Sequence, residues 1–298
     1  MTNGWFRTAV VVGACAAPMM AQAHEAGSES TDGAHGPAVV SFDWGAADTL
    51  AALGLEDHLV GLPHQAAPAY AAGLLEGRAD VGGLKTPDLE AVAEAAPDLI
   101  LATGRQSAAL EDLQAIAEVE QVALGEGDYF EALSAKVTGL AGHYGAEAQA
   151  AERLAALHDD IEAARASLAD DLEAVVVTHN DGHYSLRQAP VVGELLQIAQ
   201  PAVPASVEPV SHGTRTFTPL TPAAIAEMAP DALLVVDRSA AIGATPLDVT
   251  TLEEALAAEG GEAIAVTVLS PALWYLSGDG LQSVQAQVDE VVQALVAE

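Results

Sequence analysis

Short apolar runs alternate with amphipathic segments along most of the chain. Residues 38–42 (AVVSF) and 58–62 (HLVGL) have the length and composition of buried strands, and residues 46–54 (AADTLAALG) between them have the spacing of a helix that ends at Gly54. Residues 86–106 (TPDLEAVAEAAPDLILATGRQ) continue with a helix, a Pro-Asp turn and a strand. Because strands alternate with helices through short links, the pattern predicts parallel sheets covered by helices.

The pattern changes in the middle of the chain. Residues 129–145 read as one helix, and residues 146–171 read as a long helix without glycine or proline. A second strand–helix region follows and opens with a hairpin at Asn180-Asp181-Gly182. We therefore expect an α/β protein with two β/α lobes (38–145 and 172–298), mainly parallel central sheets, a rigid connector helix at 146–171, and a ligand cleft between the lobes.

One segment occurs twice. Residues 91–105 (AVAEAAPDLILATGR) align without gaps on residues 224–238 (AIAEMAPDALLVVDR), 133 positions later. Each copy ends in an arginine at the carboxyl end of a predicted strand. Open α/β sheets bind ligands at that end of the strands, so Arg105 and Arg238 should face one cleft from opposite lobes.

The first 37 residues differ from the rest. Residues 1–23 carry one arginine, an apolar run and the small residues Ala21 and Ala23, which predicts a signal peptide cleaved after Ala23 and export to the periplasm. The alternative is lipidation at Cys15, the only cysteine, with a much shorter apolar run. Residues 24–37 are small and polar and are predicted to be a disordered leader.

The chain is strongly acidic, with 43 Asp and Glu against 10 Lys and Arg and a net charge of −33. A field of this sign repels nucleic acid and anionic membranes, so neither is an expected partner. The acidic residues are spread along the sequence, which is typical of a solvated surface suited to high salt.

In this acidic chain, four of the few arginines occur at similar places in the predicted fold. Arg105, Arg187, Arg215 and Arg238 all fall at or after strand ends. Arginines that converge in an acidic protein form a pocket for an oxygen-rich anion, because the guanidinium fork matches planar oxygen ligands. The alternative is that each arginine only neutralises nearby carboxylates.

Two further residues are candidates for metal chemistry. Tyr275 follows a strand and a proline in LSPALWYLSGDGLQSV, and His212 lies in a glycine-containing loop, VSHGTRTF. A phenol at a strand end can bind a hard metal, whereas the ordinary alternatives are a core aromatic and a surface histidine.

Several motifs, in order along both lobes, resemble one protein family. They are GAADTLAALGLEDHLVGLP, VGGLKTPDLEAVAEAAPDLILATGRQ, SHG, PDALLVVDRSAAIG and WYLSGDGLQSV. The chain is similar to the class III substrate-binding proteins of ABC importers, and within them to the catecholate siderophore binders of the CeuE/FatB type. The resemblance covers about residues 38–297.

The resemblance implies a role for each candidate residue. Arg105, Arg187 and Arg238 would bind catecholate oxygens, and His212 and Tyr275 would complete the coordination of iron(III) when the siderophore supplies four donors. Iron(III) would arrive as cargo, with no intrinsic cofactor. The match at Arg187 is the loosest, since its context here is LRQAP.

The resemblance also implies a monomer that docks on an importer permease through one acidic residue on each lobe. Glu90 matches the first position, but the repeat places Ala223 at the second. Glu227, one helical turn later, is a possible substitute.

Other functions stay open at this stage. The same fold would suit haem, cobalamin or another siderophore, although haem does not need three arginines. A secreted metal-dependent hydrolase would need a His and carboxylate cluster, for which His179 and His183 in HNDGH are the only candidates. No nucleophile–base motif is present, so the sequence predicts a binding protein and not an enzyme.

Overall fold

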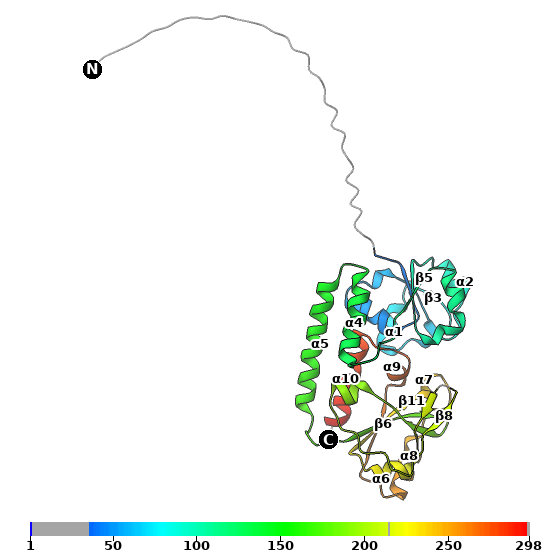
Figure 1. Cartoon of the computed structure of the whole chain (residues 1–298), viewed down its shortest axis with the longest axis vertical. Helices are drawn as coiled ribbons and strands as arrows, with labels where there is room; N and C mark the ends of the chain where they lie inside the picture. Colours follow the sequence, from blue (N-terminus) through cyan, green and yellow to red (C-terminus); the bar gives the residue numbers. More distant parts are fainter. Residues whose placement is uncertain (2–35, 214, 297–298) are drawn as a thin grey trace, which may run out of the picture. The chain divides into compact units, whose positions relative to one another are not determined.

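The computed structural model describes Met1 and residues 36–213 and 215–296. Three side chains within these ranges are not described, those of Ala66, His212 and Arg215. Residues 2–23 of the predicted signal peptide and residues 24–35 of the predicted leader lie outside the described residues (Figure 1).

The first sheet is entirely parallel. Its strand order is β3-β2-β1-β4-β5, with β1 at Val39–Ser41, β2 at Leu59–Leu62, β3 at Ala79–Asp80, β4 at Leu99–Ala102 and β5 at Glu118–Gln121. The chain adds β2 and β3 on one side of β1 and then returns to add β4 and β5 on the other side. The topological switch point of the sheet therefore lies between β1 and β4. Ligands of open α/β sheets bind outside the carboxyl ends at such a point.

The second sheet is mixed. Its order is β10-β7-β6-β11-β12, with β6 at Ala174–Asn180, β7 at His183–Leu186, β10 at Pro219–Leu220, β11 at Ala232–Asp237 and β12 at Ala265–Leu269. The strands β6, β11 and β12 are parallel, whereas β7 and β10 add an antiparallel edge. Asp181 and Gly182 form the predicted hairpin turn, both with positive φ (51° and 76°), as a two-residue turn of this kind requires. A separate two-stranded sheet pairs β8 (Val210–His212) with β9 (Arg215–Phe217).

Helices cover the sheets and connect the lobes. The α-helices are α1 (Trp44–Ala52), α2 (Leu89–Glu94), α3 (Leu110–Gln114), α4 (Tyr129–Gly142), α5 (Glu147–Ser167), α6 (Pro222–Met228), α7 (Arg238–Ala241), α8 (Val249–Ala258), α9 (Pro271–Tyr275) and α10 (Leu281–Val296). The 3-10 helices are η1 (Glu56–His58), η2 (His64–Ala66), η3 (Ala69–Leu75) and η4 (Gly104–Ala109), and η5 (Val191–Leu195) is a π-helix. None of the helices in the described ranges is long and apolar enough to cross a bilayer.

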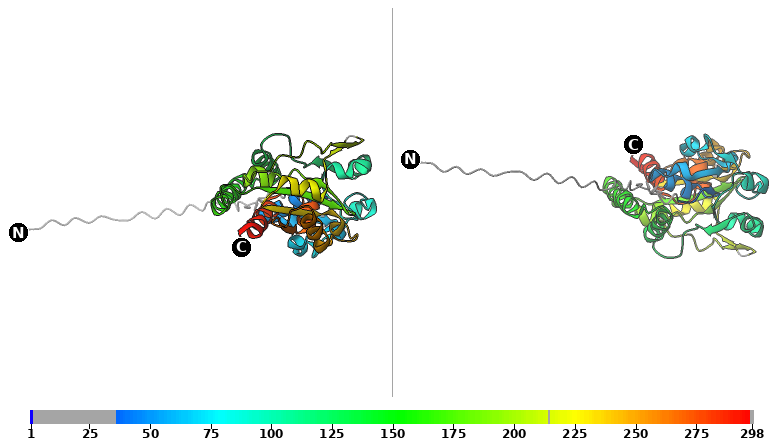
Figure 2. Two further views of the ribbon diagram at one scale, coloured as in Figure 1. Left: turned by 90° about the horizontal axis from the view of Figure 1, so that it is seen from below. Right: turned by 90° about the horizontal axis from the view of Figure 1, so that it is seen from above.

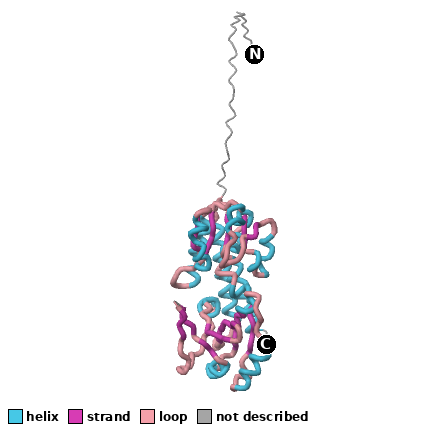
Figure 3. Tube along the Cα trace, turned by 90° about the vertical axis from the view of Figure 1, so that its right-hand side faces the viewer, coloured by secondary structure: helices cyan, strands magenta, loops and turns pink. Residues whose placement is uncertain are grey.

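Each sheet is buried on both faces. All residues of β4 and β11 are buried, as expected of central parallel strands. Separate apolar clusters lie on the two sides of each sheet, and one of them also includes residues of α4, α5 and α10. Figure 3 shows the strands in two separate groups, in agreement with the prediction of two β/α lobes. The predicted fold class is confirmed.

The repeated segment is also a structural repeat. Ala96 and Ala229, 133 positions apart, both adopt a left-handed conformation (φ 45° and 47°) between a helix and the following Pro-Asp turn. A carboxylate oxygen of Asp98 then accepts a hydrogen bond from the amide of Ala38, and Asp231 does the same for Glu173, both at 2.9 Å. The two copies therefore build the same helix–turn–strand unit beside the first strand of each sheet.

Two helices, α5 and α10, link the lobes. The helix α5 has 21 residues within the range expected for the connector, and α4 and α10 pack beside it. It lies along one side of the described residues in both views of Figure 2. The first turn of α10 is capped from α1, because Asp48 accepts hydrogen bonds from the amides of Gln282 (3.1 Å) and Ser283 (3.0 Å). A residue of the first lobe thus fixes the start of the last helix.

The helical segment after β7 is short. The apolar run VGELLQIA at residues 192–199 has the spacing of an α-helix, but only the π-helical turn η5 forms there. Gln197 has a positive φ of 55°, and the chain then extends so that the carbonyl of Ala199 accepts a hydrogen bond from the amide of Ala174 at 2.9 Å. Pairing with the start of β6 ends the helical turn early.

Candidate functional site

Arg105 reaches from the first lobe to the segment before α10. It lies in η4 directly after β4, where Thr103 and the side chain of Gln106 form a reciprocal capping box. Its guanidinium donates from Nη2 to the carbonyl of Tyr275 at 2.7 Å and from Nη1 to the carbonyl of Leu276 at 3.2 Å. The arginine therefore joins two parts of the chain 170 residues apart.

Arg187 approaches the same segment from the second lobe. It follows β7, its amide donates to the carbonyl of Val176, and its Nη2 donates to the carbonyl of Trp274 at 2.8 Å. Its Nε is buried and has no hydrogen-bond partner among the described residues. Burial lowers the pKa of Arg187 and the charge of Arg105 acts in the same direction, while the nearby Tyr275 and Asp279 oppose the shift. A buried guanidinium donor beside a second arginine suits an anionic or oxygen-rich group.

Arg238 is the third cation at this segment. It is the first residue of α7, directly after β11, and its Nε donates to the phenol oxygen of Tyr275 at 2.7 Å. Its Nη1 also contacts the side-chain carbonyl of Asn180, and its guanidinium carbon lies 5.6 Å from the centroid of the Tyr275 ring. The three predicted arginines and Tyr275 therefore converge on residues 274–276 at the end of α9.

The structure describes the side chain of only one of the two predicted iron ligands, Tyr275. The hydroxyl of Tyr275 faces Arg238. The backbone of His212 ends β8, but its side chain lies outside the described residues, and so does that of Arg215. The proposed pairing of His212 with Tyr275 on one metal ion therefore stays a prediction.

A cavity of about 200 Å³ lies beside the converging arginines. It is lined by residues from both lobes: Arg105, Tyr129, Arg187, Gln188, Ala189, Pro190, Val191, Trp274, Tyr275, Gly278, Asp279 and Gln287. This cavity, together with Arg238, is the cleft site discussed below. The sequence analysis did not single out Tyr129, Gln188 or Asp279. Asp279 stands in the SGDG turn that opens α10, and that position between two glycines is the only signal it gives.

His179 and His183 have structural roles. Nδ1 of His179 lies 2.8 Å from Oδ1 of the buried Asp237, and Nε2 accepts from the amide of Gly182, so both ring nitrogens have partners within the protein. His183 contacts the carbonyl of Asp181. Within the described ranges no three His, Cys, Asp or Glu side chains form a group that could hold a metal ion.

Asp237 explains the position of Arg238. Burial alone would raise the pKa of Asp237, but hydrogen bonds from His179 and from the amides of Leu247 and Ala240 outweigh it and hold the pKa below its ordinary value. The ionised carboxylate caps the first turn of α7. Its hydrogen bonds hold the turn on which Arg238 is carried.

The predicted docking residues lie at equivalent places in the two lobes. Glu90 is exposed in the first turn of α2, and Ala223 is exposed in the first turn of α6. Glu227 is exposed one turn further along α6. The repeat therefore places both candidate surfaces on corresponding helices, although only one carries the acid at its first turn.

Comparisons with known proteins place the chain in a family. The periplasmic binding protein family matches residues 39–258. The petrobactin-binding protein YclQ of Bacillus subtilis (strain 168) is 31% identical over 266 residues, which cover 86% of this chain and 82% of that protein. Its crystal structure has a TM-score of 0.77 and covers 88% of this chain and 93% of YclQ.

A second solved structure has a similar fold. The iron uptake ABC transporter substrate-binding protein PiuA of Streptococcus pneumoniae is 30% identical, with a TM-score of 0.73 and coverage of 87% of this chain and 93% of that protein. These relatives are substrate-binding proteins and not enzymes, which excludes the metal-dependent hydrolase considered from HNDGH. The chain belongs to the periplasmic binding protein family, with the two-lobed class III architecture.

Proposed function

We propose that this protein captures a ferric catecholate siderophore in the cleft site and delivers it to an ABC importer of the cytoplasmic membrane. The observation that supports this most directly is the convergence of Arg105, Arg187 and Arg238 on residues 274–276. In a chain with 10 basic residues, three guanidinium groups at one cleft form a locally cationic site.

The chemistry of the cargo suits this site. A ferric catecholate complex carries negative charge on oxygen atoms, and guanidinium N–H donors offset that charge strongly where water is excluded. Each guanidinium has five N–H groups. The hydrogen bonds to main-chain carbonyls use two of them at Arg105 and one at Arg187, so both retain donors for a ligand.

Tyr275 supports a complex with four donors in preference to six. A tris-catecholate fills the coordination sphere of iron(III), whereas a bis-catecholate leaves two positions for protein ligands. The phenol oxygen of Tyr275 lies at the cleft and accepts from Arg238, which would stabilise a phenolate on iron. His212 is the proposed second ligand.

The relatives point the same way. A protein of 31% identity is named for petrobactin binding, and another of 30% is named for iron uptake through an ABC transporter. By the same likeness we propose that the mature protein is periplasmic after removal of residues 1–23. We also propose that it docks on a permease through Glu90, with Glu227 as the second contact.

Titration of the mature protein with ferric complexes tests the proposal. Bis-catechol, tris-catechol and hydroxamate complexes are added at high salt, and the fluorescence of tryptophan is followed, since Trp274 lines the cavity. The proposal predicts tight binding of the catecholates, preference for the bis-catechol complex and no response to the hydroxamate. Folded protein that ignores both catecholates would contradict it, and haem and cobalamin would be titrated next.

A further inference from the structure

The carboxyl end of α9 is capped by arginines from both lobes. The last carbonyls of a helix have no partner within the helix and need donors from elsewhere. At α9 the carbonyl of Trp274 accepts from Arg187, and the carbonyls of Tyr275 and Leu276 accept from Arg105. The positive charge of these arginines also suits the carboxyl end of a helix. The place of α9 therefore decides where donors of both arginines lie.

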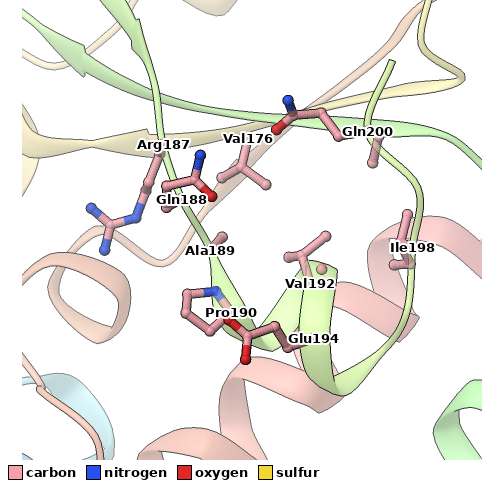
Figure 4. A pocket seen from close by; sticks show the side chains of 11 residues that line it. Val176, Arg187, Gln188, Ala189, Pro190, Val192, Glu194, Ile198 and Gln200 are labelled. Atoms are coloured by element: carbon pink, nitrogen blue, oxygen red, sulfur yellow. The ribbon is translucent and has the colours of Figure 1, made fainter. Parts of the chain in front are cut away.

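Arg187 is directed to α9 and not into the neighbouring cavity. That cavity, of about 320 Å³, is lined by Arg187 together with apolar side chains that include Val176, Val192 and Ile198. The guanidinium of Arg187 lies to one side of these three side chains (Figure 4). Its Nη2 donates instead to the carbonyl of Trp274 at 2.8 Å. The orientation of Arg187 thus depends on α9.

One carboxylate of α10 holds the other end of α9. Oε1 of Glu290 accepts hydrogen bonds from the amide (2.8 Å) and from the hydroxyl (2.7 Å) of Ser270, the residue before α9. Oε2 of the same carboxylate accepts from Nε1 of Trp274 at 2.6 Å. The side chain of Ser270 makes no capping hydrogen bond to α9. Glu290 therefore binds two donors just before the helix and one donor within it.

The helix α9 depends on such contacts because it has only five residues. Helices of this length are not stable by themselves, since forming the first turn costs more conformational freedom than its hydrogen bonds return. Trp274 is buried in an apolar cluster that includes Val288 of α10. Gln287 of α10 donates from Nε2 to the carbonyl of Leu273 at 3.2 Å. The orientation of α9 is therefore set by side chains of α10.

We infer that Glu290 is a positioning residue for ligand binding: it holds α9 in the orientation in which Tyr275 faces the ligand. Glu290 is not among the residues that line the cleft cavity, so it acts through α9. Tyr275 follows Trp274 directly, and a rotation of α9 that moves the indole also moves the phenol away from Nε of Arg238. This inference rests on the proposed function and adds to it a residue outside the cleft.

Four variants test the inference. Glu290→Gln keeps the size of the side chain but replaces one acceptor oxygen by an NH₂ group, which conflicts with the donors of Ser270 or Trp274. Trp274→Phe removes the indole donor, so the double variant Trp274→Phe with Glu290→Gln is free of this conflict. Asp289→Asn is the matched control, because Asp289 precedes Glu290 in α10, is exposed and loses the same charge.

Ferric bis-catechol and tris-catechol complexes are titrated into each protein, and their absorbance is followed. We expect Glu290→Gln to weaken the bis-catechol complex by about tenfold and to shift its charge-transfer band. The tris-catechol complex should be weakened less, since only the bis-catechol complex uses Tyr275. Asp289→Asn should match the wild type within about twofold, and the double variant should match Trp274→Phe within about twofold, because both substitutions act on one hydrogen bond.

Wild-type affinity and an unchanged band in Glu290→Gln would overturn the inference even if the variant melts at a lower temperature, because a purely structural contact affects stability alone. Losses that multiply in the double variant would overturn it too, since Glu290 would then not act through Trp274. If the wild type binds neither complex, the proposed function fails and the inference fails with it. Circular dichroism checks the fold, and Glu290→Asp, one methylene shorter, replaces Glu290→Gln if that variant does not fold.

Discussion

The guanidinium of Arg238 donates a hydrogen bond from Nε to the phenol oxygen of Tyr275 at 2.7 Å, across 37 residues of sequence. The same guanidinium lies over the Tyr275 ring, with its carbon 5.6 Å from the centroid. The pair joins the proposed anion-binding group to the proposed metal ligand. Because the two groups have different roles, their removal should have different consequences.

Removal of the Tyr275 hydroxyl should affect only complexes that leave iron positions open. We expect Tyr275→Phe to weaken binding of the ferric bis-catechol complex by about tenfold or more and to leave the tris-catechol complex within about twofold. The charge-transfer band of the bound bis-catechol complex should also shift, because a phenolate ligand is lost. An unchanged band in Tyr275→Phe would show that the tyrosine is not on the iron.

Removal of an arginine should weaken every ferric catecholate. We expect Arg105→Gln and Arg238→Gln each to cost about 10- to 100-fold in affinity for both the bis- and tris-catechol complexes, since a charged donor to oxygen is lost. Arg153→Gln serves as the matched control, because Arg153 is exposed on α5, away from the cleft site. Equal affinities in all three variants would remove the arginines from the binding site.

The sequence allowed prediction of those parts of the fold that depend on local pattern. The fully buried strands β4 and β11 follow from their apolar runs. The repeat of residues 91–105 at 224–238 predicts that Arg105 and Arg238 lie just after the carboxyl ends of these two strands. Local chemistry decides these features, so one sequence suffices.

Features that depend on distant partners could not be predicted. The hydrogen bond from Tyr129 to Asp279 joins residues 150 positions apart, and nothing near either residue indicates the other. The ending of η5 after Leu195 depends on the pairing of Ala199 with Ala174, a tertiary contact that overrides helical periodicity. The tethering of the arginines to the carbonyls of 274–276 likewise appears only in three dimensions.

The cap of α10 makes stability depend on pH. Burial raises the pKa of Asp48 to about 6, although hydrogen bonds from Ser283, Tyr70 and the amide of Gln282 oppose the shift. With a raised folded pKa, the stabilisation is complete below the unfolded value of 3.8 and is lost as the pH rises through about 6. We expect the free energy of unfolding of the wild type, relative to Asp48→Asn, to fall by on the order of 2 kcal/mol between pH 4 and pH 6.5.

Denaturant titrations of both proteins at a series of pH values at high salt measure this difference. The other acidic groups are shared by the two proteins, so their titration cancels in the comparison. A difference that does not vary with pH, or that grows as the pH rises, would contradict the raised pKa of Asp48.

The contact between α1 and the start of α10 requires a glycine. A Cβ added at Gly280 would lie 2.0 Å from the carbonyl oxygen of Gly45, a main-chain atom that cannot move without shifting α1. We expect Gly280→Ala to lower the free energy of unfolding by about 2–4 kcal/mol. Gly139→Ala is the matched control: it lies inside α4 with open space at the Cβ position, and it should stabilise by up to about 1 kcal/mol. Similar stabilities of the two variants would mean that the contact is not tight in solution.

The links between the lobes predict limited movement on ligand binding. The helix α5 has 21 residues and an unbroken hydrogen-bond pattern, and bending it would break main-chain hydrogen bonds that have no other partners. The amides at the start of α10 are held by Asp48 and Thr49 of α1. Arg105 adds hydrogen bonds from the first lobe to residues 275 and 276. Closure by a wide hinge would have to break these contacts together.

Solution scattering of the free and the ligand-loaded protein measures this movement. We expect nearly superimposable curves, with local rearrangement of side chains around residues 274–276 as the main response to ligand. The variant Asp48→Ala removes the acceptor for the first amides of α10, and it should increase the difference between the two curves if that cap restrains the lobes. A large rotation in the wild type would show that the connector and the cap yield more easily than their hydrogen bonds imply.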